Sequence, residues 1–412
     1  MTASSQSSPR WLAIALGIAL LAGILVAWTP RYWGICVAVA SVSLVAAMWA
    51  LLARRVALPL QTILVVPLTG WGVLQLATHQ TLVRWPTTLA SIAWTMGGAC
   101  FILGSQILER CRNRTAFLDL MMWAATALAA AATLQIYVTP GKLFGMIPVA
   151  DSVVGTFFYK NQFAAMLELA APIALWKVFD GEVVAGGLCY AAMFAATLAS
   201  GSRAGVLLVS MEFLVFLILM VARRRMPVKS IAAIVAVVLV LMTGAALVAG
   251  TERIRGRFEE RNPFALRRNL LDATLKMIPL RPWFGSGMGT WAIVFPRFAT
   301  FDSNVYVNEA HNDWAQWTAE GGIPFTVILA ALLFSLVRPA LRSVWGLGVI
   351  SVIGHSFVDY PLREPVLMFL FFTLAGALTE TGESTQGINP GIRDGAGGQL
   401  SDGSLKFLGF RE

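Results

Sequence analysis

Charged residues are scarce in this sequence. Asp, Glu, Lys and Arg make up 13% of its 412 residues, whereas hydrophobic residues make up 57%. A soluble domain usually carries about 25% charged residues. Apolar runs of about 20 residues, long enough to cross a bilayer as a helix, recur along most of the chain. The composition excludes a soluble globular domain and predicts an all-α polytopic membrane protein.

Cysteine and histidine are also rare, with four and three residues. The cysteines lie in or beside apolar runs without metal-ligand spacing, which predicts small core residues and neither a disulfide nor a zinc site. The formal net charge of +9 comes mostly from basic residues that flank the apolar runs. Membrane topology explains that pattern better than a nucleic-acid partner does.

Windows of about 19 residues predict about twelve transmembrane helices. They lie near 11–28, 33–53, 56–77, 86–108, 115–137, 159–178, 183–200, 203–222, 230–250, 323–337, 344–358 and 365–380. No small-residue cleavage site follows the first apolar run, so an uncleaved first span is expected. We expect one transmembrane domain over 1–380. The Gly-, Ser- and Asp-rich residues 381–412 are expected to form a disordered tail.

The basic residues of the short connections predict the orientation. Twelve Lys and Arg fall on one side and six on the other, which predicts that both termini are cytoplasmic. A long connection, about 251–310, then falls on the periplasmic side, and loops of that length are often functional. Within it, "ALRRNLLDATLKMI" has helical spacing and "PLRPWFGSGMGTW" is typical of a glycine-rich turn.

Five polar segments share that outer side, which predicts one composite site at the rim of the bundle. They are "GTFFYKNQFA" at 155–164, "SGSRAG" at 200–205, the segment 267–289, "NEAHNDWAQWTAEGG" at 308–322 and "HSFVDYPLREP" at 355–365.

Three arginines on this side are candidates for binding phosphate. Arg203 begins a predicted span, and Arg267 and Arg268 lie on the predicted loop helix. The planar guanidinium group suits bidentate binding of phosphate. The structural alternatives are an interfacial side chain at Arg203 and a solvated helix face at the other two.

The segment 308–322 holds one of the three histidines. Its spacing predicts a helix that breaks at Gly321–Gly322, with Trp314 and Trp317 in an interfacial aromatic belt. Nine positions separate His311 from Glu320, so the two lie on opposite sides of a helix. We expect Glu320 either to bind backbone or arginine groups near the break or to serve packing. His311 is either a general base, a role that suits histidine because an unperturbed imidazole has a pKa of about 6.5, or a structural residue.

Other polar residues in or near the spans are candidates for supporting roles. His355 and Asp359 are spaced i, i+4, which predicts a hydrogen bond between their side chains. Glu168 lies two turns below Asn161 and is expected to brace the outer site, whereas Glu212 lies mid-span without an evident partner.

Together, these segments resemble the O-antigen ligase and bacterial polysaccharide polymerase superfamily over roughly residues 155–375. The matching elements are "GTFFYKNQFA" with Asn161, "SGSRAG" with Arg203, an arginine before "DATLKMIPLRPWFGSGMGT", "AHNDWAQWTAEGGIP" and "HSFVDYPLREP". The residues carried by the last two elements are His311, Asn312, Glu320, His355 and Asp359. Arg267 fits the position of the loop arginine better than Arg268, by its spacing to "DATLKMI".

The resemblance implies a bundle of the GT-C glycosyltransferase type in the bacterial inner membrane, with its active site in the periplasm. Such enzymes move a glycan from an undecaprenyl-pyrophosphate carrier to a glycolipid or glycan acceptor, without a cofactor. The arginines would then bind the pyrophosphate and His311 would be the base. No DxD-like acidic pair stands in the outer loops, which agrees with metal independence.

The identity of the acceptor distinguishes the possible transferase functions. Lipid A–core sugar makes the protein an O-antigen ligase, which we favour, and another lipid-linked repeat makes it a polymerase. The compact loop and the lack of an added soluble domain argue against a protein glycosylase. A transporter or flippase would show internal repeats and polar residues near mid-membrane, whereas this chain concentrates its polarity at one rim.

Overall fold

The computed structural model describes residues 8–29, 31–53, 55–148, 155–222, 228–249, 255–256, 264–302 and 306–379. The tail expected over 381–412 lies outside the described residues. The first helices are α1 (Arg10–Leu25), α2 (Arg31–Leu52), α3 (Thr62–Ala77), α4 (Arg84–Ile107), α5 (Cys111–Val138), α6 (Lys160–Phe179), α7 (Val183–Ser200), α8 (Arg203–Ala222) and α9 (Val228–Ala249). The others are α11 (Ala265–Met277), α12 (Trp291–Val294), α13 (Asp313–Arg342), α14 (Leu347–His355) and α15 (Pro365–Ala377).

The helices agree with an all-α membrane protein. Seven of those described are long and apolar enough to cross a bilayer, and five shorter apolar helices occupy the remaining predicted ranges. Each of the predicted spans therefore overlaps an apolar helix, although a total of twelve spans is not confirmed. The predicted loop helix is present as α11, which confirms its periodicity.

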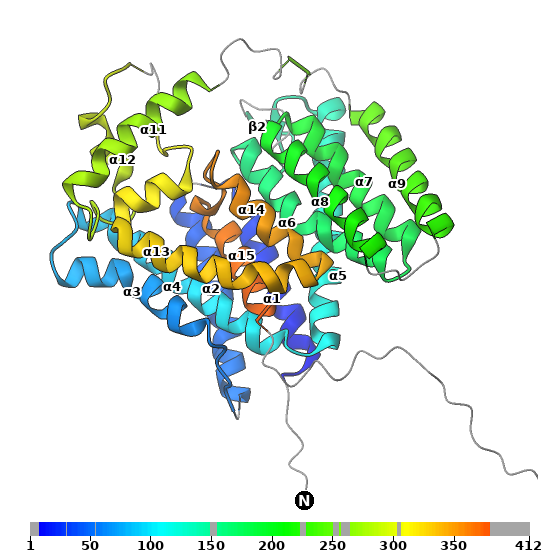
Figure 1. The fold of residues 1–412 in the computed structure, drawn as a ribbon, viewed down its shortest axis with the longest axis horizontal. Helices are drawn as coiled ribbons and strands as arrows, with labels where there is room; N and C mark the ends of the chain where they lie inside the picture. Colours follow the sequence, from blue (N-terminus) through cyan, green and yellow to red (C-terminus); the bar gives the residue numbers. More distant parts are fainter. Residues whose placement is uncertain are drawn as a thin grey trace, which may run out of the picture.

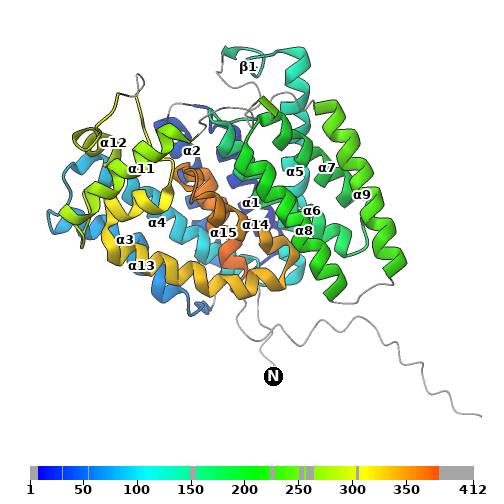
Figure 2. The same ribbon diagram turned by 45° about the horizontal axis from the view of Figure 1, so that its top comes forward.

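The bundle has two flanks and a central group of helices (Figure 1). Helices α7, α8 and α9 form one flank, and α3 and α4 belong to the other. Helices α6, α14 and α15 lie between them. Figure 2 shows α11 and α12 beside the first half of α13 from a second direction, in agreement with their contacts. The 278–280 and 361–363 segments are the 3-10 turns η1 and η4.

A short hairpin was not predicted from the sequence. Strands β1 (Lys142–Leu143) and β2 (Ile147–Pro148) pair antiparallel, with Leu143 opposite Ile147. This hairpin follows α5 and precedes α6 on the chain.

The segment that holds His311 differs from its prediction in the start of the helix and in the position of Trp317. The helix begins at Asp313, so His311 precedes it, and it continues to Arg342 with Gly322 (φ 82°, ψ 172°) interrupting its helical conformation. The predicted break is therefore present. The aromatic-belt prediction was wrong for Trp317, which is 1% exposed and packs edge-to-face on Trp94. Packing against α4 overrides the interfacial preference of tryptophan because it buries the whole ring.

Candidate active site

The start of α13 is joined to the turn that follows α14, residues 356–360. The Asp313 amide donates to the carbonyl oxygens of Ser356 (2.9 Å) and Asp359 (3.1 Å). The side chain of Asn312 caps α13 by accepting from the Ala315 amide (2.9 Å), and its Nδ2 donates to the Phe357 carbonyl (2.8 Å). Cap and turn together hold the residue before the cap, His311, next to Asp359.

Asp359 is the centre of a buried polar cluster, with a side chain only 1% exposed. Its Oδ2 accepts from Arg267 Nη2 (2.7 Å), from Tyr159 (3.3 Å) and from Asn161 Nδ2. Its Oδ1 lies 3.3 Å from Nδ1 of His311. Four segments distant in sequence, around 159–161, 267, 311 and 359, therefore meet at one carboxylate. The predicted convergence of Asn161, Arg267, His311 and Asp359 at one place is present in the structure.

The charges of this cluster keep Asp359 ionised. Burial by itself would raise the pKa of the carboxyl group, but the interaction with His311 and the positive charge of Arg267 outweigh it and lower the pKa to about 2. Burial alone would lower the pKa of Arg267, and Asp359 overcomes this and raises it. The cluster thus contains a fixed carboxylate paired with a fixed guanidinium group.

His311 is held in a conformation that a histidine rarely adopts. Its φ of 54° lies in the left-handed region, which costs about 1–2 kcal/mol for a residue with a Cβ. Its ring makes T-shaped contacts with Tyr360 (centroids 4.9 Å apart) and Tyr159 (6.0 Å), and these two tyrosines stack on each other. Nδ1 faces Asp359 at 3.3 Å without the alignment of a formed hydrogen bond, so a small ring rotation would complete it. Backbone strain of this kind clusters at functional sites.

Arg203 is placed by the turn between α7 and α8. Gly201 ends α7 with φ 69°, and Ser202 Oγ then caps α8 by accepting from the Gly205 amide (3.2 Å). Arg203 is therefore the first residue of α8, and its guanidinium carbon lies 5.1 Å from the centre of the Phe264 ring. Since Phe264 directly precedes α11, Arg203 lies at the start of the helix that carries Arg267.

The two adjacent arginines of α11 face different surroundings. The side chain of Arg267 is 24% exposed and reaches Asp359, whereas Arg268 is exposed. Neighbouring residues on a helix point about 100° apart, so only one of a consecutive pair faces a given neighbour. Of the two candidates, Arg267 belongs to the polar cluster.

His355 does not form the side-chain hydrogen bond with Asp359 that its i, i+4 spacing predicts. Its Nδ1 instead lies 2.8 Å from Glu168 Oε1, with both side chains fully buried. Asp359 lies beyond the end of α14, and its amide rather than its side chain bonds to the His355 carbonyl (3.0 Å). Helix α6 thus contacts this region twice, at Asn161–Asp359 and at Glu168–His355. Glu168, which was expected to support the outer site, contacts this region through His355.

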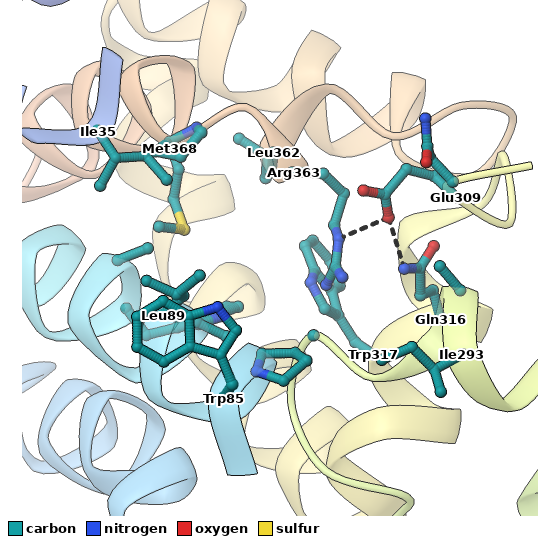
Figure 3. Close-up of a pocket in the computed structure, with 18 of the residues that line it drawn as sticks. Ile35, Trp85, Leu89, Ile293, Glu309, Gln316, Trp317, Leu362, Arg363 and Met368 are labelled. Carbon is teal, nitrogen blue, oxygen red and sulfur yellow. Dashed lines mark hydrogen bonds and ion pairs between the residues drawn. The ribbon is translucent and has the colours of Figure 1, made fainter. Parts of the chain in front are cut away.

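Glu320 belongs to a second buried cluster. Its carboxylate pairs with Arg363 through two contacts of 2.8 and 3.0 Å, and it also accepts from the Trp291 amide (3.0 Å). Arg363 Nε donates to Glu309 Oε2 (3.1 Å), which also accepts from Gln316 (2.6 Å), as Figure 3 shows. The expectation that Glu320 binds backbone and arginine groups, and not His311, is confirmed.

The glycine-rich turn fixes this second cluster against the break in α13. Gly285 has φ 67°, and a Cβ there would overlap the backbone of Glu320. The amides of Ser286 and Gly287 donate to the carbonyls of Ala319 (2.9 Å) and Glu320 (3.0 Å). The turn therefore supplies the backbone partners that the interrupted helix lacks.

Sequence reasoning missed Tyr159, Tyr360 and Arg363 as site residues. All three lie in the quoted motifs, but a tyrosine or arginine near the end of a span is also typical of a membrane interface. The partners of Arg363 are 43 and 54 positions away. Such pairs have no periodic signal in the sequence.

The chain matches the model of a protein family described as O-Antigen ligase, over residues 188–330. The match supports membership of the O-antigen ligase superfamily, as the motifs predict, and so an enzyme of the ligase or polymerase type in a membrane. It includes Arg203, Arg267, His311 and Glu320, while Asp359 lies beyond it. No curated protein matches the chain significantly.

Proposed function

We propose that this protein transfers a glycan from an undecaprenyl-pyrophosphate carrier to a sugar hydroxyl of lipid A–core, as an O-antigen ligase. The observation that supports it most directly is the joining of Arg267, Asp359 and His311 in one cluster. A cation, a buried carboxylate and an imidazole are the groups that departure of a pyrophosphate and attack by a hydroxyl require.

The leaving pyrophosphate gains negative charge as the glycosidic bond breaks. Cations that are already in place stabilise that charge without reorganisation. Arg267 would do so from α11, and Arg203 from the start of α8. The amide groups at the first turn of α8 would add to the attraction, because a helix N-terminus favours an anion. This reaction needs no metal, so EDTA is expected to leave transfer unchanged.

The attacking hydroxyl is a poor nucleophile until it loses its proton. With Nδ1 of His311 directed to Asp359, Nε2 is the nitrogen that would accept this proton. Asp359 would orient the ring and stabilise the imidazolium ion that results. Attack opposite the pyrophosphate would invert the anomeric centre.

The adjacent arginines provide a matched test. With purified protein in nanodiscs, lipid-linked glycan and lipid A–core, Arg267→Ala is expected to abolish transfer and Arg268→Ala to leave it within about threefold. His311→Ala should lower kcat by about 10²–10⁴. Arg203→Lys should rescue poorly, because lysine lacks the planar fork. Equal loss from both α11 variants, or normal product from His311→Ala, would refute these assignments.

The acceptor and the side of the membrane need separate tests. Loss of long-chain lipopolysaccharide in a deletion strain, with lipid-linked polymer still made, is expected for a ligase. Lipopolysaccharide capped with single repeats would instead identify a polymerase. Cysteine labelling at Asp272→Cys with an impermeant reagent, in intact inner-membrane vesicles of known orientation, should report a periplasmic α11.

A further inference from the structure

A cavity of about 280 Å³ lies beside the second buried cluster and takes no part in the proposed pyrophosphate site. Its walls come from α2, α4, α12, α13, η4 and α15, whereas Arg203 and Arg267 belong to α8 and α11. Figure 3 shows Trp85 on one side of the cavity and Glu309, Gln316 and Arg363 on the other.

The polar floor of this cavity is preorganised. Arg363 forms ion pairs with Glu320 and Glu309, which fix its position. Burial alone would lower the pKa of Arg363, but the two carboxylates outweigh this effect and raise it. Gln316 donates to Glu309 (2.6 Å) and accepts from the Ala310 amide (2.8 Å). These groups hold their positions through one another and present a polar surface of fixed geometry.

Three exposed residues at the rim of the cavity have side chains without a hydrogen bond or ring contact within the described ranges. Trp85 is 62% exposed and Tyr306 78% exposed, and Asn308 is exposed as well. Within the described ranges, none of these side chains makes a hydrogen bond or ring contact. Exposed aromatic rings with an apolar face and a polar edge, next to an amide and a carboxylate, are suited to a sugar ring. The rings cover its C–H face, and the polar groups bind its hydroxyls.

We infer that this cavity binds the sugar of the acceptor glycolipid. The inference rests on the proposed function, since an acceptor exists only for a transferase. His311 follows Glu309 by two residues, a distance of at most about 7 Å along the backbone. Glu309, which lines the cavity, is therefore close to the proposed base along the chain, and the helices around the cavity carry neither phosphate-binding arginine.

The apolar part of the cavity suits the lipid end of the same molecule. Ile35, Leu89 and Met368 line it between α2, α4 and α15. All three helices are apolar and belong to the predicted spans. A glycolipid could therefore keep its acyl chains beside α2 and α4 while its sugar reaches Trp85, Asn308 and the polar floor.

The test measures the KM for the acceptor and the KM for the donor separately, with the full-length protein in nanodiscs. Lipid A carrying only its core oligosaccharide is the acceptor probe, and undecaprenyl-pyrophosphate-linked glycan is the donor. Trp85→Ala and Asn308→Ala are each expected to raise the acceptor KM, by about tenfold for the tryptophan, and to leave the donor KM within twofold. The matched control is Trp123→Ala, since Trp123 is 55% exposed on α5 and lies outside the cavity.

Binding of the acceptor probe in the absence of donor separates this inference from the proposed function. If wild type binds the probe and Trp85→Ala binds it about tenfold more weakly, but no transfer occurs, the proposed function is wrong and the cavity is a glycolipid-binding site without an acceptor role. If transfer occurs and the acceptor KM is the same in Trp85→Ala, Asn308→Ala and Trp123→Ala, the function stands and this inference is wrong. A rise in the donor KM alone also overturns it, because the cavity would then hold the donor glycan.

Discussion

Replacement of Asp359 by asparagine tests the central cluster, because it removes one charge and keeps the shape. The carboxylate is 1% exposed, and its pKa is lowered from 3.8 to about 2. A lowered pKa in the folded state means that the ionised group stabilises the fold. At 1.36 kcal/mol per pKa unit, the contribution is about 2 kcal/mol, fully present at neutral pH. Asp359→Asn, which resembles the protonated acid, is expected to lose this amount.

The loss of activity should be much larger than the loss of stability. Without the carboxylate, His311 loses the group that orients its ring, and Arg267 loses its counter-ion. We expect kcat for transfer to fall by about 10²–10⁴ while the protein stays folded. The assay is transfer in nanodiscs together with thermal unfolding, and Asp272→Asn is the control, since Asp272 is exposed on α11. Activity of Asp359→Asn within threefold of wild type would refute the proposed role.

Three other predictions concern the folded structure. The difference in unfolding free energy between wild type and Asp359→Asn should disappear as the pH falls from about 4 towards 2, which denaturation at several pH values would check. Glu320→Gln should cost about 3 kcal/mol because it leaves the buried Arg363 poorly compensated; an unchanged melting temperature would contradict this. Gly285→Ala should cost about 2 kcal/mol or more, because residue 285 has a φ of 67° and a Cβ there would overlap the backbone of Glu320. The control, Gly70→Ala, adds a Cβ on the open face of α3 and should be tolerated. Equal thermal stability of the two variants would contradict this prediction.

Much of the fold could be predicted from the sequence. The apolar ranges and the helix from 265 to 277 are properties of nearby residues, because burial in a bilayer or on a helix face repeats at short, regular spacing. The break at Gly322 was also predictable, since consecutive glycines followed by proline end a helix locally. The buried position of Trp317 was not, because it depends on α4, which is more than 200 positions away.

The candidate site was likewise predictable from the sequence only in part. The motifs identified His311, Arg267, Asn161 and Asp359 as polar residues on one side of the bundle. They did not identify Glu168 as the partner of His355, since an i, i+4 pair in the sequence predicted another contact.

The sequence by itself determined that the chain is helical and apolar, where the helices lie, and which polar segments stand at helix ends. Hydrophobic periodicity and local capping carry that information over a few turns. Only the tertiary structure decided which carboxylate pairs with which cation, that Arg267 rather than Arg268 reaches Asp359, and that a cavity opens beside Arg363. These pairings depend on helices distant in sequence, and a buried charge is tolerated only where such a partner is brought to it.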